Sequence, residues 1–184
     1  MSASDGTTPA NDSFTWTVIV PQPHALDFDG VNDYVTFGAA PSLGSATFTL
    51  ETWFKREGAG VGTGTGSGGI ASAIPLVTKG RSETDGSNVD MNYFLGIDST
   101  TGNPTSGRLV ADFEEGPSAG GTPGLNHPVA GITVVTSNVW HHAAATYDGT
   151  MWRLYLDGTL DTTETEGAFT PRSDSWFMIR PIAT

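Results

Sequence analysis

The chain has 184 residues, enough for one domain with a sizeable core, and its 10% aromatic content argues against a disordered chain. The net charge is −12 and only 8 residues are Lys or Arg, which disfavours binding to nucleic acids and to anionic membranes. The absence of cysteine excludes disulfides, thiol nucleophiles and cysteine-ligated zinc, and no apolar run is long enough to span a membrane.

The N-terminal stretch predicts one strand that precedes the main body of the chain. Residues 1–11 are polar and rich in turn formers, without the basic and apolar regions of a signal peptide. We therefore expect any secretion signal to lie on a longer precursor. Residues 13–20 alternate, with Phe14, Trp16 and Val18 on one side, and a Pro-Gln-Pro break follows.

Three alternating segments come next and predict strands that bury one face. Residues 25–28 and 34–37 flank an Asp-rich turn, and Phe48–Lys55 follows after a short connection. In the third segment Glu51 and Trp53 point away from the apolar side. The residues expected to face the core are Leu26, Phe28, Val35, Phe37, Phe48, Leu50 and Phe54.

The middle of the chain alternates between short strands and turn-rich loops. Residues 58–69 are mostly glycine and predict a mobile surface loop, because the Gly-Lys-Ser/Thr end of a phosphate-binding loop is missing. Residues 81–92 form an acidic loop. Short apolar strands are predicted at residues 74–78, 93–97, 108–113, 132–135 and 176–179.

The strongest hairpin signal lies between Trp140 and Leu156. Two alternating strands, 140–147 and 151–156, flank an Asp-Gly turn, and glycine accepts a positive φ there at no steric cost. Trp152 shares the apolar face with its alternate neighbours, whereas Arg153 and Tyr155 face the other way. A second Asp-Gly turn ends the pair.

Three motifs of the chain, in this order, resemble the LamG-like domains of the concanavalin A-like superfamily. They are ALDFDGVNDYVTF from Ala25, FTLETWFK from Phe48, and WHHAAATYDGTMWRLYLDG from Trp140. The resemblance implies an all-β fold, a two-sheet antiparallel β-sandwich of the jelly-roll type. Frequent turns and the lack of a long helical pattern favour the same fold class.

The resemblance also suggests how the chain divides. Residues 1–23 resemble the tail of a bacterial immunoglobulin-like repeat with its linker, and residues 24–184 resemble the jelly roll. The family ends in a closing strand of the Asp-Glu-Val-Arg-Ile-Tyr type, and these residues contain no counterpart. We therefore expect a jelly roll that lacks its closing strand.

No catalytic pattern stands out. Glycoside hydrolysis needs two carboxyl groups that face each other across a sugar, and the glucanase Glu-X-Asp-X-X-Glu pattern is absent. There is no Gly-X-Ser-X-Gly elbow either, and a hydrogen-bonded structural role is expected for His141 and His142. We expect a non-enzymatic protein.

Calcium is the only candidate cofactor, because acidic turns supply the oxygen ligands that this ion prefers. An ordinary polar turn is the alternative for each candidate cluster. The first cluster consists of Asp27, Asp29, Asn32 and Asp33, and the second consists of Glu83, Asp85, Asn88, Asp90 and Asn92. Among these, the predicted metal ligands are Asp27, Asp29, Asp85, Asp90 and Asn92.

Glycan binding would use an outward-facing aromatic platform with polar neighbours. Trp53 and Tyr155 are the candidate platform, and cross-strand packing without a ligand is the alternative for Trp53. Their predicted polar neighbours are Glu51, Asn92 and Arg153. Trp140 and Trp152 are expected in the core instead.

Two hypotheses of different classes follow. The first is a non-catalytic recognition module of a larger extracellular or cell-surface protein, which binds a glycan or a protein surface with calcium as a candidate cofactor. The second is an assembly subunit, in which residues 14–20 complete the sandwich of a neighbouring copy by donor-strand complementation. In a third, simpler interpretation the mismatched ends are arbitrary boundaries.

Overall fold

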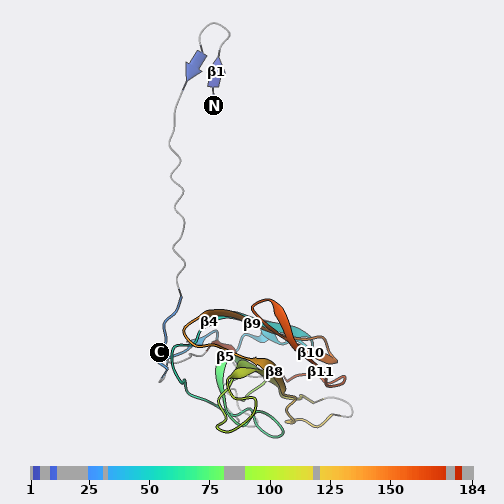
Figure 1. Ribbon diagram of the computed structural model, residues 1–184. Coiled ribbons are helices and arrows are strands. Elements are labelled where there is room, and N and C mark those ends of the chain that lie inside the picture. Colours follow the sequence, from blue (N-terminus) through green and yellow to red (C-terminus); the bar gives the residue numbers. More distant parts are fainter. Residues whose placement is uncertain are drawn as a thin grey trace.

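The structure, a computed structural model, describes residues 2–4, 9–11, 25–30, 33–80, 90–117, 121–172 and 177–179. Within these ranges the regular structure is β, apart from one short 3-10 helix, η1 (Pro41–Leu43). Neighbouring strands of both main sheets run antiparallel, and the sheets stack as two layers (Figure 1). The predicted all-β sandwich is confirmed.

One layer is a four-stranded sheet in the order β11-β10-β9-β4. Its strands are β4 (Phe48–Lys55), β9 (Trp140–Tyr147), β10 (Met151–Leu156) and β11 (Thr159–Thr165). β9 pairs with β10 through the predicted Asp-Gly hairpin and with the distant β4 through all eight residues, from Phe48↔Tyr147 to Lys55↔Trp140.

The other layer is a six-stranded sheet in the order β3-β12-β5-β6-β7-β8. Its strands are β3 (Val35–Thr36), β5 (Ala73–Lys79), β6 (Tyr93–Asp98), β7 (Arg108–Phe113), β8 (Val129–Val134) and β12 (Phe177–Ile179). A separate two-stranded pair is formed by β1 (Ser2–Ser4) and β2 (Pro9–Asn11).

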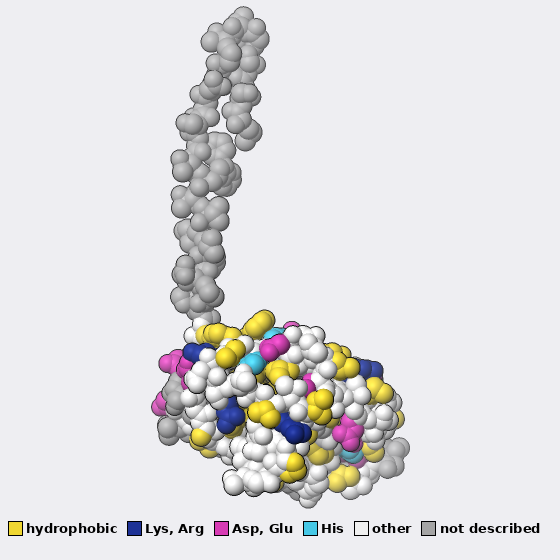
Figure 2. All heavy atoms as spheres, viewed as in Figure 1, with side chains coloured by type: hydrophobic (Ala, Val, Ile, Leu, Met, Phe, Trp, Pro, Cys, Tyr) yellow, Lys and Arg dark blue, Asp and Glu magenta, His cyan; other side chains and the backbone are white. Residues whose placement is uncertain are grey.

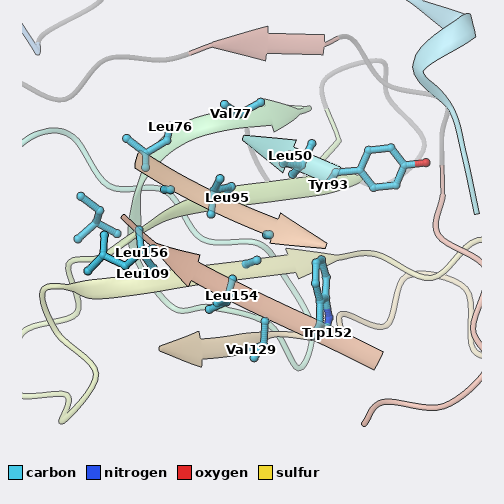
Figure 3. Packing of buried hydrophobic residues seen from close by; sticks show 14 of the residues in the cluster. Leu50, Leu76, Val77, Tyr93, Leu95, Leu109, Val129, Trp152, Leu154 and Leu156 are labelled. Carbon is cyan, nitrogen blue, oxygen red and sulfur yellow. The ribbon is translucent and has the colours of Figure 1, made fainter. Parts of the chain in front are cut away.

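The core lies between the two sheets, where alternate residues of each strand meet. Trp152 is fully buried, and its indole N–H donates to the His127 carbonyl at 3.0 Å, so burial leaves no unpaired polar atom on this side chain. Figure 3 shows side chains of both sheets converging on this layer. The labelled members are Leu50, Leu76, Val77, Tyr93, Leu95, Leu109, Val129, Trp152, Leu154 and Leu156.

The predicted hairpin is confirmed, but the strand after it was missed. Strands β7, β9 and β10 begin and end where the alternation predicts. The second turn, with Asp157 at φ 52° and Gly158 at φ 76°, leads directly into β11. The β11 sequence is mostly Thr and acidic residues, so it lacks the apolar alternation on which the strand predictions rest.

Two residues that were expected in the core are exposed. Leu26 is 65% exposed and Phe37 is 57% exposed, so their predicted burial is wrong. Residues 25–30 form no strand, and β3 is two residues long and, within the described ranges, pairs with β12 alone at the sheet edge. An alternating sequence sets the direction of a side chain, but the side chain is buried only where another layer of the protein packs over it.

The glycine-rich segment, residues 58–69, lies at the surface, as predicted, and is hydrogen-bonded to the sheet. Thr63 and Ala73 exchange two backbone hydrogen bonds of 2.9 Å. Thr65 is fully buried, and its hydroxyl donates to Asp112 Oδ2 at 2.5 Å. The predicted strand at residues 14–20 lies outside the described residues, and its exchange between copies stays a prediction.

Candidate functional site

The four-stranded sheet turns one face to the core and the other, called here the outer face, away from it. On β9, the odd-numbered residues point inward and the even-numbered residues point outward, as the burial pattern shows. The register places Trp53 opposite His142, Lys55 opposite Trp140, and both Glu51 and Tyr155 opposite Ala144. The side chains that matter below are Glu51, Trp53, Trp140, His142, Arg153 and Tyr155.

Two tryptophans stand exposed at one end of this face. Trp53 is 67% exposed and Trp140 is 50% exposed. Trp140 is opposite Lys55, two residues beyond Trp53, so the two indoles occupy diagonal positions on adjacent strands, about 7–8 Å apart at the backbone. Exposed apolar groups gathered in one place mark interaction surfaces more often than scattered ones do.

Polar side chains border the two indoles. The Trp53 and His142 rings lie 5.2 Å apart between centroids, at an angle of 50°. Glu51 Oε2 is 3.8 Å from His142 Nε2, and 65% of the Glu51 side chain is exposed. Figure 2 shows hydrophobic, histidine and acidic side chains intermixed along the upper edge, over β4 and β9.

The two described cations whose side chains project from this face, Lys55 and Arg153, are already paired. Arg153 Nη1 donates to Asp148 Oδ2 at 2.7 Å, and this bond, with three more from Thr150 and Met151 at the Asp-Gly turn, holds the pKa of the Asp148 carboxyl well below its usual range. Lys55 Nζ forms an ion pair with Glu57. Glu51 therefore has no comparable Lys or Arg partner among the described residues of the outer face.

A buried histidine holds the outer face in register. His141 points inward, with Nδ1 2.8 Å from Asp157 Oδ2 and Nε2 2.9 Å from Thr136 Oγ1. The other Asp157 oxygen accepts the backbone N–H of His142 at 2.8 Å. Burial works to raise the pKa of Asp157, but the hydrogen bonds from His142 and His141 outweigh it and lower that pKa. The expected structural role of His141 is confirmed.

The structure brings together four of the five predicted glycan-binding residues and separates the fifth. Glu51, Trp53, Arg153 and Tyr155 all project from the outer face. Asn92 does not: it is fully buried beside the six-stranded sheet, where its backbone N–H donates to the Lys79 carbonyl at 2.7 Å.

Trp140 is the functional candidate that sequence reasoning missed, and its predicted place in the core is wrong. The inward position at this end of β9 belongs to His141, and Trp140 takes the opposite face. The signal was present in the sequence, because alternation counted back from Ala143 and Ala145 assigns His141 inward and Trp140 outward.

The described members of the two predicted calcium clusters lie in different surroundings. Asp90 is fully buried, and its Oδ2 lies 2.9 Å from Arg172 Nη1, which also donates to Glu114 Oε1 at 2.6 Å. Asp27 and Asp29 are exposed, near Asp33. Glu83, Asp85, Asn88 and Asn32 lie outside the described residues. Among the residues that are described, no three His, Cys, Asp or Glu side chains gather as a metal site would require.

A pocket of about 350 Å³ lies where the glycine-rich segment approaches β7 and β8, away from the outer face. Its lining includes Ile70, Val110 and Ala130. The buried carboxylate of its lining, Asp98, accepts the Thr100 backbone N–H at 2.7 Å and the Thr105 hydroxyl, so it stabilises the β6–β7 turn.

No helix in the described part of the chain is long and apolar enough to cross a membrane.

Two antiparallel sheets packed face to face define a β-sandwich, and this one exposes two indoles on one outer surface. The sequence profile of the concanavalin A-like lectin/glucanases superfamily matches residues 29–180. This chain belongs to that superfamily. A comparison with curated proteins finds no match.

Solved structures with the same fold include the CBM40 of the Ruminococcus gnavus IT-sialidase. Its structure with α2,3-sialyllactose has a TM-score of 0.52 and 14% identity, and the match covers 80% of this chain and 77% of that chain. A second structure of the same CBM40 has a TM-score of 0.51 and 15% identity, with the same coverage. At this identity the likeness concerns the fold.

Proposed function

We propose that this chain is a non-catalytic glycan-recognition module that binds sugar rings on the outer face, within an extracellular protein. The observation that carries the proposal is the pair of exposed indoles, Trp53 and Trp140, on adjacent strands. A pyranose ring presents an apolar C–H face, which packs on the negatively charged face of an aromatic ring, while its hydroxyls need polar partners beside that ring. Glu51, His142 and Tyr155 supply such partners.

The surroundings of the two indoles support this ligand class. Both side chains project from the strands of a sheet whose register is fixed by β9, so the platform is preformed and binding costs little conformational entropy. The platform contacts its ligand from one side, as suits an extended polysaccharide. The CBM40 that shares the fold has been solved with α2,3-sialyllactose, which supports a sugar as the kind of ligand.

The acidic residues around this face support binding without hydrolysis. Cleavage of a glycosidic bond needs two carboxyl groups on opposite sides of that bond. Glu57 and Asp148 pair with Lys55 and Arg153, and Asp157 uses both oxygens on the two histidines. Glu51 is left as a single carboxylate beside Trp53. Calcium binding stays a separate proposal, with Asp27, Asp29, Asp85, Asp90 and Asn92 as its predicted ligands.

The test is binding to a panel of soluble and insoluble polysaccharides by the protein and by Trp53→Ala and Trp140→Ala. Each substitution removes a stacking surface, so we expect about a tenfold loss of affinity for any glycan that binds, which corresponds to about 1.4 kcal/mol. Ile132→Ala is the matched control, because Ile132 is 68% exposed but lies on β8 of the other sheet.

The control variant should bind as the unchanged protein does, and circular dichroism should show that all three variants are folded. Repeating the panel with EDTA tests the calcium proposal. If the unchanged protein binds no polysaccharide, or if both tryptophan variants bind as well as it does, the outer face is not a glycan site.

A further inference from the structure

The charges around the two indoles indicate which sugars fit the outer face. Resting on the proposed function, we infer that this face takes uncharged glycans, and that Glu51 is the residue that discriminates against acidic ones. Glu51 lies two residues before Trp53 on β4, and both side chains project from the same face. Residues spaced by two along a strand are about 7 Å apart, so a sugar stacked on Trp53 lies within reach of this carboxylate.

The Glu51 carboxylate is open toward such a ligand. Its side chain is 65% exposed, and the residue opposite on β9 is Ala144, which is too small to cover it. The nearest ring nitrogen, His142 Nε2, is 3.8 Å away, beyond hydrogen-bond distance. A carboxylate in this position accepts hydrogen bonds from sugar hydroxyls and repels a sugar carboxylate.

The two described cations of the outer face, Arg153 and Lys55, are engaged elsewhere. A carboxylated sugar would have to draw Arg153 away from Asp148, or Lys55 away from Glu57. Either exchange leaves an acidic side chain beside the ligand, so no net charge is neutralised. The chain as a whole carries −12, which adds a long-range repulsion at low ionic strength.

One residue therefore has opposite effects on the two ligand classes. With a neutral glycan, Glu51 contributes charge-assisted hydrogen bonds, so Glu51→Gln should weaken binding slightly. With an acidic glycan, the same substitution removes a like charge and should strengthen binding roughly fivefold. A residue that only supported the strand would change both affinities in the same direction.

The experiment compares matched pairs of glycans with and without carboxylates. The pairs are lactose with α2,3-sialyllactose, hydroxyethyl cellulose with carboxymethyl cellulose, and methyl-esterified pectin with polygalacturonate. Each is titrated with the unchanged protein, Glu51→Gln and Trp53→Ala at low and at high salt. We expect binding to the neutral member of at least one pair and at least severalfold weaker binding to its acidic partner. Glu51→Gln and high salt should each reduce this difference in affinity, and Trp53→Ala should weaken binding to both glycans.

Two outcomes overturn the inference and leave the proposed function standing. In the first, the acidic glycan binds as tightly as its neutral partner or more tightly, and this binding depends on Trp53. In the second, Glu51→Gln leaves the difference in affinity between the two glycans unchanged. A different outcome overturns the proposed function, and the inference with it. That outcome is no binding to either member of any pair, or binding that neither Trp53→Ala nor Trp140→Ala weakens.

Discussion

At the scale of single residues, Asp112 shows how burial controls a charge. Its side chain is fully buried under the glycine-rich segment, where Oδ1 accepts the His127 backbone N–H at 2.8 Å and Oδ2 accepts the Thr65 hydroxyl. Burial outweighs these hydrogen bonds and raises the pKa of Asp112 from 3.8 to about 7. The folded protein therefore holds a proton there that the unfolded chain releases.

This shift makes stability depend on pH in a predictable direction. Below pH 3.8 both states hold the proton, and between 3.8 and about 7 only the folded state does, so the free energy of unfolding falls as pH rises through this window. Asp112→Asn cannot ionise, and its amide can still bond His127 and Thr65. Urea denaturation at pH 4 and pH 8 measures the free energy of unfolding of both proteins. From pH 4 to pH 8, this free energy should change in favour of the variant, relative to the unchanged protein, by on the order of 4 kcal/mol.

Other acidic groups are present in both proteins, so their contributions cancel in this comparison. An equal pH dependence of the two proteins would show that the pKa of Asp112 is the same in the folded and the unfolded state, which would contradict the prediction.

At the scale of elements, the glycine-rich segment is a packed cover of the six-stranded sheet. The residue directly after it, Ile70, joins a second apolar cluster with Phe94 and Val110 on the sheet face that points away from the main core. Glycine is needed where this cover approaches the sheet most closely. A side chain at Gly69 would overlap Thr65 Oγ1 and would lie 2.7 Å from Asp112 Oδ2.

Gly69→Ala should therefore destabilise the fold by about 1–3 kcal/mol, as overpacking does. Gly64→Ala is the control in the same segment, since the nearest atom to its added carbon would be Ala71 O at 3.2 Å. Neither glycine has a positive φ, so the comparison isolates the steric effect. The measurement is the thermal midpoint of each variant. Equal midpoints for the two variants would mean that the cover moves aside without cost.

At the scale of the whole molecule, the two sheets depend on one shared core. Residues from both sheets form a single cluster around Trp152, Phe113 and Leu95, and each sheet leaves its apolar face without cover if the other is lost. The two sheets should therefore unfold together, although strand pairing joins residues as distant as Phe48 and Tyr147.

Far-ultraviolet circular dichroism reports the strands, and near-ultraviolet circular dichroism reports the packed aromatic side chains. Because the core is shared, we expect the two signals to change at the same temperature and denaturant concentration. Two separated transitions would contradict this, and would indicate that one sheet keeps its structure after the other has melted.

Local sequence determined the strands and the direction of their side chains. Alternation located β7, β9 and β10, and it placed Trp152 inward and Trp53, Arg153 and Tyr155 outward, because side-chain direction along a strand has a period of two whatever the partner strand is. The LamG-like motifs also predicted the sandwich, and the motifs that begin at Phe48 and Trp140 coincide with one strand and one hairpin of it.

Only the tertiary structure decided which strands became neighbours and which faces were covered. The pairing of β4 with β9 brings Trp53 beside His142 and Trp140, although about ninety residues separate them in the chain. The packing of Thr65 on Asp112 and the exposure of Leu26 were also decided at this level. Local alternation assigns a face to each side chain, but burial and partners come from contacts between distant segments, which depend on register and on what covers each sheet.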